Sequence, residues 1–322
     1  TQHPDLKIYE QWLQNQKHGE MKYLERHLKP KSDPRQLLPQ AKTFLCIGLN
    51  YYNGPVPTSA QPKISRYAMG RDYHDILKKK LNQIARFIQN QIDSQTQVRI
   101  FTDTGPVLER SYAVLAGLGW IGKNTCLINR KIGSWLFIGE MLLSLDLNSD
   151  PIETDHCGTC TRCIDACPTD ALTPYELDAN RCISYWTIEQ KSDFSTDQKN
   201  NLKEWVVVCD ICQYVCPWNR KVVMTQHEDF FAKPELLNLD VFNEKIWTRK
   251  YFDEIFAESS LSYMGYEKFI RNLIVVMGNL GDKKYLKSLQ AAEKIISEES
   301  FKPILQESIQ KLMVSNPDQM PD

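Results

Sequence analysis

The distribution of cysteine most restricts what this chain can form. The sequence of 322 residues has 10 cysteines, and all but two of them lie between Cys157 and Cys216. A disulfide framework is typical of short secreted chains, whereas this chain is long and has an ordinary balance of 42% apolar and 25% charged residues. The clustered cysteines therefore indicate metal binding.

The first group of cysteines has the spacing Cys157-x-x-Cys160-x-x-Cys163-x-x-x-Cys167-Pro168. This is the bacterial ferredoxin run, in which three closely spaced thiolates hold one [4Fe–4S] cluster and the fourth, before the proline, holds another. Structural zinc sites also use Cys-x-x-Cys pairs, but they rarely use the full run. We therefore predict two [4Fe–4S] clusters, with a pair of zinc sites as the alternative.

A second set of cysteines must supply the remaining ligands. The stretch "CDICQYVCP" contributes Cys209, Cys212 and Cys216, and Cys182 is the nearby cysteine left to complete the set. We assign Cys157, Cys160, Cys163 and Cys216 to one cluster, and Cys167, Cys182, Cys209 and Cys212 to the other.

The chain before the cysteine region alternates between strand and helix patterns. Apolar runs predict strands at residues 42–52 and 97–101, and one strand or a pair of strands at 133–147. Apolar residues at three- and four-residue steps predict a helix at 72–92, and Pro106 suits the first turn of a helix at 103–119. This alternation indicates an α/β domain. Cys46 and Cys126, which fall here, are expected to be buried small residues.

Three domains are expected from changes in composition. Residues 1–150 form the α/β domain, residues 151–225 the cysteine-rich domain and residues 226–322 a helical region. The stretch "NSDPIETDH" marks the first boundary through its turn residues and charges. From Asp240 onward the pattern is helical throughout, with a glycine-containing turn between two helices.

Asp103 is the candidate for acid–base chemistry. It lies where a predicted strand ends and a predicted helix begins, which is the edge of an α/β sheet where ligands usually bind. A carboxylic acid there could donate a proton to a reacting group. Aspartate is also a preferred residue at helix starts, so a purely structural role stays open at this point.

Charge and hydropathy restrict how this chain could meet nucleic acid or a membrane. The formal net charge is -1, so nucleic-acid binding would need a local basic patch rather than an overall positive field. The apolar run "WLFIGEMLLSL" is too short to span a bilayer and contains Glu140. We expect a cytoplasmic protein without a membrane partner. Thr1 stands where a Met is expected, which leaves open whether a leader precedes it.

Five stretches together resemble one known family. "DTGPVLER", "GLGWIGKNT", "GSWLFIGE", "CGTCTRCIDACPTDAL" and "CDICQYVCPWN" occur in this order in epoxyqueuosine reductases, which are cobalamin-dependent iron–sulfur enzymes of tRNA modification. The resemblance runs from "MKYLERHLKP" to the helical tail, and the start of the chain looks shorter than in the family. It implies a cobalamin-binding α/β domain of reductive-dehalogenase/nitroreductase-like type, a bacterial ferredoxin-like domain and a HEAT-like helical C-terminal region.

The resemblance also implies a reaction. Two [4Fe–4S] clusters would pass electrons to cobalamin, and epoxyqueuosine at the wobble position of tRNA would be reduced to queuosine. Asp103 matches the family's proton donor, and desolvation is expected to raise its pKa. The implied partners are tRNA carrying epoxyqueuosine in its anticodon and a low-potential electron donor of flavodoxin or ferredoxin type. The protein is expected to be a monomer.

Further site residues follow from the same matching. Arg26, Arg66 and Trp135 match contacts to the corrin ring, alongside Asp103, and Arg110 matches a contact to substrate or tRNA. Lys123 and Asn124 lie in a matched motif without an assigned role. In the helical tail, possible phosphate contacts are Lys283, Lys284 and Lys287.

Two other functions remain possible on the sequence. A reductive dehalogenase acting on a small molecule would also combine cobalamin with two clusters. A non-catalytic iron–sulfur electron-transfer protein would use the clusters and tail, with the α/β domain binding a partner or a flavin.

Overall fold

The computed structural model describes residues 3–55 and 61–314. The chain divides into two compact units that each combine segments distant in sequence. The first unit comprises Thr1–Tyr52, Asp72–Asn180 and Ile211–Phe230, and the second comprises Asn53–Arg71, Arg181–Asp210 and Phe231–Asp322. The domain boundaries expected at residues 150 and 225 stay a prediction.

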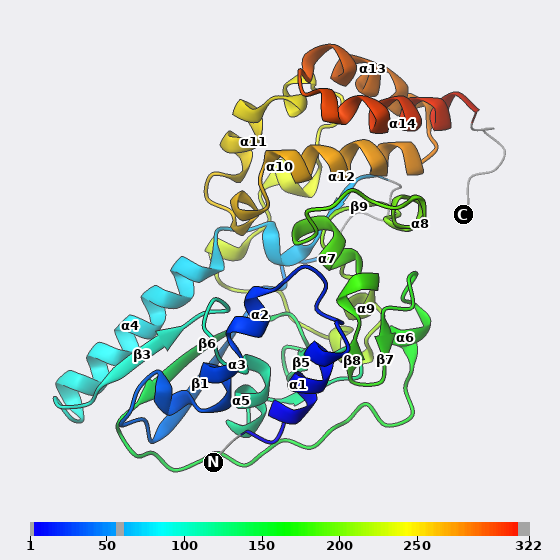
Figure 1. Ribbon diagram of the computed structural model, residues 1–322. Coiled ribbons are helices and arrows are strands. Elements are labelled where there is room, and N and C mark those ends of the chain that lie inside the picture. The colour runs from blue at the N-terminus through cyan, green and yellow to red at the C-terminus, as the bar shows by residue number, and fades with distance from the viewer. Residues whose placement is uncertain (1–2, 56–60, 315–322) are drawn as a thin grey trace. The chain divides into compact units, whose positions relative to one another are not determined.

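The first unit is built on a three-stranded antiparallel sheet in the order β1-β6-β3 (Figure 1). Its strands are β1 (Thr43–Asn50), β3 (Val98–Phe101) and β6 (Leu136–Leu143). Every residue of the central strand β6 is buried, which agrees with its nearly continuous apolar sequence. The three strand predictions are confirmed, and the run at 133–147 forms one strand.

Helices cover both faces of this sheet. Met141 and Leu143 of β6 pack against α4 (Tyr73–Gln91), whereas Leu136 and Ile138 pack with Ala113 of α5 (Glu109–Leu115). Since side chains alternate along a strand, Glu140 belongs to the α5 face. Helix α4 confirms the prediction at 72–92.

The helix predicted from residue 103 is shorter than expected. Helix α5 spans only Glu109–Leu115, so the prediction was wrong for residues 103–108, which include Pro106, and for residues 116–119. Asp103 has a φ of 58°, which no helical residue can adopt. The carbonyl of Val107 accepts a hydrogen bond of 2.7 Å from the Lys31 ammonium. This contact from a distant segment satisfies a backbone group that a helix would otherwise satisfy.

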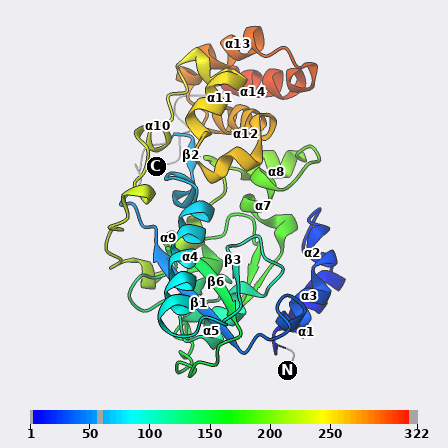
Figure 2. The ribbon, with the colours of Figure 1, turned by 90° about the vertical axis from the view of Figure 1, so that its left-hand side faces the viewer.

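The N-terminal segment lies beside the sheet as three short helices (Figure 2). They are α1 (Leu6–Gln14), α2 (Tyr23–Arg26) and α3 (Leu28–Ser32). Helix α3 carries Lys31 to the loop before α5. The N-terminal segment thereby contributes a buried cation to the region around Asp103.

The cysteine-rich part of the first unit consists of short elements. Two hairpins are formed by β4 (Trp120–Ile121) with β5 (Leu127–Ile128), and by β7 (Leu172–Thr173) with β8 (Glu176–Leu177). Helix α6 (Arg162–Asp165) packs against α9 (Ile211–Tyr214). The two cysteine-bearing segments of this unit, 157–167 and 212–216, are thus brought together.

The second unit is mainly helical. Its strands β2 (Lys63–Ile64) and β9 (Trp205–Val207) pair in parallel. Its helices are α7 (Ile183–Ile188), α8 (Thr196–Asn201), α10 (Pro234–Leu237), α11 (Arg249–Phe256), α12 (Tyr266–Asn279), α13 (Leu286–Ile295) and α14 (Lys302–Val314). The helical pattern predicted from Asp240 onward is confirmed, and its HEAT-like character stays a prediction.

Helix α12 forms the centre of the second unit. The fully buried Asn272 donates hydrogen bonds to the carbonyls of Thr187 (2.9 Å) and Val206 (2.8 Å). These bonds tie the C-terminal helices to the segment 181–210. Within residues 3–55 and 61–314, none of the helices combines the length and the apolar character needed to cross a membrane.

Candidate functional site

Asp103 lies in a strained turn directly after β3. Its φ of 58° is uncommon for any residue other than glycine, although aspartate tolerates it better than most. The turn is closed by a hydrogen bond of 2.5 Å from the Thr104 amide to the Thr102 carbonyl. The Asp103 side chain is 59% exposed, so a ligand can reach its carboxyl group. Strained backbone of this kind is concentrated at functional sites.

Two residues at the start of α4 contact the Asp103 carboxyl. The Tyr73 hydroxyl donates a hydrogen bond of 2.8 Å to Oδ2 of Asp103. Nε2 of His74 lies 3.7 Å from the same oxygen. On its other side, Nδ1 of His74 contacts Asp72 at 2.7 Å, and Asp72 also caps α4 through the His74 amide. The imidazole is therefore held between two carboxylates.

This arrangement sets the protonation of His74 and Asp103. Burial opposes a charge on His74, but the contacts with Asp103 and Asp72 outweigh it and raise the pKa of His74 to about 9. The same His74 contact holds the pKa of Asp103 below its ordinary value, against the effect of burial. The expectation of a raised pKa for Asp103 is therefore wrong, because its charged partner outweighs desolvation.

Three further ionisable residues lie behind Asp103. Burial and the negative charge of Asp103 raise the pKa of Glu109 to about 7. Glu140 is fully buried, and neither of its carboxyl oxygens has a hydrogen-bond partner among the described residues. Burial, followed by the charge of Glu109, raises the pKa of Glu140 well above its ordinary value. The Lys31 ammonium places a positive charge near Glu109, Glu140 and Asp103, although burial lowers the pKa of Lys31.

Sequence reasoning missed most of this set. The sequence did not predict four of its residues as site residues, namely Tyr73, His74, Lys31 and Glu140. Glu140 was noted only as a charge that disfavours a membrane span. One usable signal was a charged residue within an otherwise apolar strand, since buried charges need a reason. The pairing of His74 with Asp103 depends on the packing of α4 against the sheet and has no local signal.

The residues predicted to contact the corrin ring or the substrate differ in their exposure to solvent. Arg26 is exposed at the end of α2, and Arg110 is exposed and donates to the Thr125 carbonyl at 2.7 Å. Trp135 is 1% exposed and packs edge-on against Tyr51. Arg66 belongs to the second unit, where its side chain is buried. The roles of all four residues stay predictions.

The backbone of Arg66 contacts the residue that follows Cys209. Its backbone amide donates to Asp210 at 2.9 Å, and the Ser65 hydroxyl donates to the same carboxyl group. Asp210 is fully buried and directly follows Cys209. The β2 strand region is thereby fixed to the start of the second cysteine segment.

Four of the predicted cluster ligands are neighbours in the first unit. Burial raises the pKa of the Cys163 thiol to about 11, and the charges of Cys216 and Cys157 add to this effect. The pKa of Cys216 is likewise raised by burial and then by neighbouring thiols, which include Cys157 and Cys160. These are the four cysteines assigned to one cluster. Their mutual proximity fits a single iron–sulfur centre, because such a centre needs converging thiolates.

Aromatic rings pack against two of these thiols, those of Cys157 and Cys216. Trp120 is buried together with Cys216, and Cys157 and Trp218 pack against them. Trp120 also meets the His156 ring edge-on at 4.9 Å. An apolar enclosure of this kind limits water access, which lowers the reduction potential of a bound cluster.

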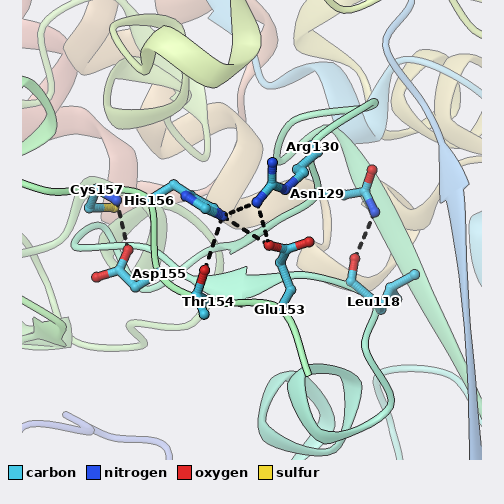
Figure 3. Close-up of polar contacts among 8 residues, drawn as sticks. All are labelled: Leu118, Asn129, Arg130, Glu153, Thr154, Asp155, His156 and Cys157. Carbon is cyan, nitrogen blue, oxygen red and sulfur yellow. Dashed lines mark hydrogen bonds and ion pairs between the residues drawn. The ribbon is translucent and has the colours of Figure 1, made fainter. Parts of the chain in front are cut away.

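A charged group flanks the Cys157 loop (Figure 3). Arg130 contacts Glu153 at 2.8 Å and Nε2 of His156 at 2.6 Å. Oδ1 of Asp155 accepts a hydrogen bond of 2.7 Å from the Cys157 amide. His156, which precedes Cys157, is thus engaged with charged side chains.

The other four predicted ligands are divided between the two units. Cys167 and Cys212 belong to the first unit, and Cys182 and Cys209 to the second. The Cys167 sulfur accepts from the Ala171 amide at 3.4 Å. No set of three or more His, Cys, Asp or Glu side chains in residues 3–55 and 61–314 is arranged to hold a single metal ion. The assignment of these four to one cluster stays a prediction.

Two further groups carry predictions from the sequence, the cysteines outside the motifs and the lysines of the tail. Cys46 packs into the α5 face of the sheet but is half-buried rather than buried as expected, and burial still raises the pKa of its thiol. Cys126 is close enough to Cys216 to affect its pKa. Lys284 forms a surface ion pair of 2.8 Å with Asp282. All three lysines, Lys283, Lys284 and Lys287, are exposed and stay predicted phosphate contacts.

Two family models match the chain. One is described as "Epoxyqueuosine reductase QueG, DUF1730" and matches residues 31–104, and the other is described as "4Fe-4S double cluster binding domain" and matches residues 156–219. The second match confirms a [4Fe–4S] domain in the segment of the first cysteine run.

Curated relatives and solved structures agree with these matches. An epoxyqueuosine reductase of Leadbetterella byssophila is 44% identical over 268 residues, which cover 83% of this chain and 87% of the relative. A crystal structure of epoxyqueuosine reductase with an epoxyqueuosine-modified tRNA-Tyr stem loop has a TM-score of 0.79 and 26% identity, covering 95% of this chain and 92% of that one.

A second solved structure concerns the Bacillus subtilis enzyme. It has a TM-score of 0.78 and 25% identity, covers 95% of this chain and 92% of that one, and shows that enzyme with its catalytic loop swung out of the active site. The resemblance drawn from the five motifs is thereby confirmed, and the dehalogenase and electron-carrier alternatives are set aside. On this identity and coverage, the chain belongs to the epoxyqueuosine reductase family of oxidoreductases.

Proposed function

We propose that this protein reduces epoxyqueuosine to queuosine at the wobble position of tRNA. Two electrons and two protons are consumed, both carbon–oxygen bonds of the epoxide break, and the oxygen leaves as water. Family membership supports this reaction, as does the solved relative bound to an epoxyqueuosine-modified stem loop. The observation that carries it furthest is the reachable Asp103 carboxyl with its two partners from α4.

The Asp103–His74 pair is proposed to supply a proton to the departing oxygen. With its pKa of about 9, His74 is protonated at neutral pH, while the lowered pKa of Asp103 keeps that carboxyl ionised. The epoxide oxygen becomes strongly basic as its bonds to carbon break. The imidazolium of His74 gives its proton to the Asp103 carboxylate, and Asp103 passes that proton to the oxygen. The second proton needed to release water comes from solvent, which reaches the exposed Asp103 carboxyl. Tyr73 orients the carboxylate through its hydrogen bond.

Cobalamin is the proposed cofactor of the α/β domain. When bound, it supplies a strongly reducing cobalt centre for breaking the carbon–oxygen bonds. Arg26 fits such a cofactor because its guanidinium is exposed and can bind phosphate or amide groups, and Asp103 fits because its carboxyl is exposed. Arg66 and Trp135 are proposed as further contacts. Both side chains are buried, so they fit a direct contact less well than Arg26 and Asp103 do.

Two [4Fe–4S] clusters are proposed to carry the electrons from a flavodoxin- or ferredoxin-type donor. Cys157, Cys160, Cys163 and Cys216 would hold one cluster, and Cys167, Cys182, Cys209 and Cys212 the other. The match to a double cluster binding domain and the mutual proximity of the first four thiols support this assignment. Cysteine-ligated clusters can reach the low potentials that cobalamin reduction demands.

The remaining proposals concern organisation and partners. The three domains would be a cobalamin-binding α/β domain of reductive-dehalogenase/nitroreductase-like type, a ferredoxin-like domain and a HEAT-like region. Exposed Arg110 is proposed to contact the tRNA or its modified base. Lys283, Lys284 and Lys287 are proposed to contact the tRNA phosphates. The protein is proposed to act as a cytoplasmic monomer, since its substrate is a cytoplasmic RNA.

The test is conversion of the modified nucleoside. Protein with reconstituted clusters is incubated with cobalamin, a strong reductant and tRNA containing epoxyqueuosine, and the digested nucleosides are analysed by mass spectrometry. We expect loss of one oxygen from the wobble nucleoside, dependent on cobalamin and abolished in Asp103→Asn. Asp75→Asn, which changes an exposed carboxylate on α4, is the matched control and should retain activity. Absence of conversion by protein with intact clusters and bound cobalamin would overturn the proposal.

A further inference from the structure

Lys123 bridges the β4–β5 turn and the first cysteine loop. Its ammonium group donates hydrogen bonds to the carbonyls of Gly158 (2.7 Å) and Cys160 (3.0 Å). The backbone of Lys123 also takes part, because its amide is directed at the Cys157 sulfur and its carbonyl accepts from the Tyr175 amide at 3.1 Å. One residue therefore contacts the cysteine loop through both its side chain and its main chain.

The loop that Lys123 contacts is tightly turned. The Cys160 amide donates to the Cys157 carbonyl at 3.0 Å, and Gly158 between them has a φ of 50°, which favours glycine. Of the two carbonyls that accept from Lys123, that of Gly158 lies within this turn and that of Cys160 lies at its end. Without the ammonium group, both carbonyls would need other donors.

The position of Lys123 is itself fixed by the β4–β5 hairpin. The Gly122 amide donates to the Cys126 carbonyl at 2.9 Å, which closes the turn. The adjacent Asn124 is buried, accepts from the Cys126 amide at 3.2 Å and donates to the Cys212 carbonyl at 3.4 Å. The hairpin thus contacts both cysteine-bearing segments of the first unit, and Lys123 is the cation it places beside the first of them.

The other charged residues near this loop are either paired or of opposite sign to Lys123. Arg130 is paired with Glu153, so its charge is largely offset within its own group. Asp155 is the nearest anion in sequence and binds the Cys157 amide, and the charge of Lys123 is among the causes that lower its pKa. Lys123 and Asp155 therefore act on the Cys157 loop with opposite signs.

We propose that Lys123 is a positioning residue that fastens the Cys157–Cys160 loop and raises the reduction potential of the [4Fe–4S] cluster held by Cys157, Cys160, Cys163 and Cys216. The inference rests on the proposed ligand assignment. Reduction adds a negative charge to the cluster, and a nearby fixed positive charge stabilises the reduced form. Hydrogen bonds to ligand sulfur act in the same direction. Partial burial of Lys123 limits screening by salt.

The experiment is a redox titration of the full chain with reconstituted clusters, followed by EPR of the reduced [4Fe–4S] signals. Lys123→Gln retains a donor but loses the charge, and we expect it to lower one midpoint potential, so that the reduced fraction at a fixed ambient potential falls several-fold. Lys123→Arg should stay close to the parent. Asp155→Asn retains an acceptor, and it should shift the same potential upward. Lys79→Met, which removes an exposed charge on α4, is the matched control and should change neither potential.

Iron release to a ferrous chelator tests the fastening role separately. Lys123→Met, which has neither charge nor donor, should release iron faster than Lys123→Gln and the parent. Equal release rates would overturn the fastening role. Unchanged potentials in Lys123→Gln, or shifts of the same sign in Lys123→Gln and Asp155→Asn, would overturn the electrostatic role. A parent chain that forms no [4Fe–4S] signal would overturn the ligand assignment and this inference with it, whatever the outcome of the tRNA assay.

Discussion

Tyr73 and Asp103, which come from the start of a helix and the end of a strand, are joined by a hydrogen bond of 2.8 Å. The tyrosine is buried against Phe137 of β6, with the two rings stacked 4.2 Å apart. The ring therefore fixes the position of the hydroxyl, and the hydroxyl fixes the carboxylate in its strained turn. The carboxylate proposed to deliver the proton is thus oriented by the core of the first unit.

Removing this hydroxyl should slow the reaction without unfolding the protein. A hydrogen bond to a charged group contributes about 1.5–3 kcal/mol, so Tyr73→Phe is expected to reduce the single-turnover rate roughly tenfold or more. The measurement is nucleoside conversion with saturating tRNA. Tyr263→Phe, at an exposed tyrosine, is the control. A rate equal to that of the parent would show that Tyr73 does not orient Asp103.

The pH dependence should report the charge of His74. Activity is expected to fall as the pH rises through about 9, because the imidazole then loses the proton it shares with Asp103. His74→Gln should be slower at pH 7 and should lack this alkaline limb. Single-turnover rates between pH 6 and 10 provide the test, and an unchanged limb in His74→Gln would assign it to another group.

The free energy of unfolding should also depend on the charge of His74, and it should fall as the pH rises. The folded pKa of His74 is raised from its ordinary 6.5 to about 9, so the folded protein retains a proton that the unfolded chain releases. The resulting stabilisation is complete below about pH 6.5 and is lost as the pH rises through 9. Denaturant unfolding of the parent and His74→Gln should differ most at pH 6 and converge at pH 10. A difference that grows with pH would contradict the assignment.

Glu140 should reduce stability at neutral and alkaline pH. Its raised pKa means that the folded protein holds a proton that the unfolded chain gives up above its ordinary pKa of 4.5, so stability falls as the pH rises. Glu140→Gln removes this cost and is expected to be at least as stable as the parent at pH 8, with a smaller advantage at pH 5. Glu254→Gln, at an exposed position, should change stability by less than about 0.5 kcal/mol. Strong destabilisation by Glu140→Gln at pH 8 would show that Glu140 is ionised in the folded state.

The cluster ligands can be separated from the other cysteines by iron content. Cys163→Ser is expected to lower the iron and sulfide bound per chain by about half, because one of the two proposed clusters would lose a ligand. Cys46→Ala should leave both values unchanged, since Cys46 lies in the core of the sheet. Equal iron content in all three proteins would remove Cys163 from the ligand set.

The sequence by itself determined the elements whose causes are local. The spacing from Cys157 to Cys167 identified an iron–sulfur segment because a short loop must bring several sulfurs to one cluster. Apolar runs identified β1, β3 and β6, and the helical periodicity of residues 72–92 identified α4, because burial of one face requires those patterns. The family was recognisable from five motifs because each motif is a short, local stretch of the sequence.

Only the tertiary structure decided which side chains act on one another. Asp103 was singled out from its place after a strand, but its lowered pKa depends on His74, which helix packing brings within 3.7 Å. The Val107 carbonyl just before α5 accepts from Lys31 of an N-terminal helix, and the role proposed for Lys123 depends on a loop 35 residues away in sequence. Contacts between distant segments follow from how whole elements pack, and no local pattern of residues encodes them.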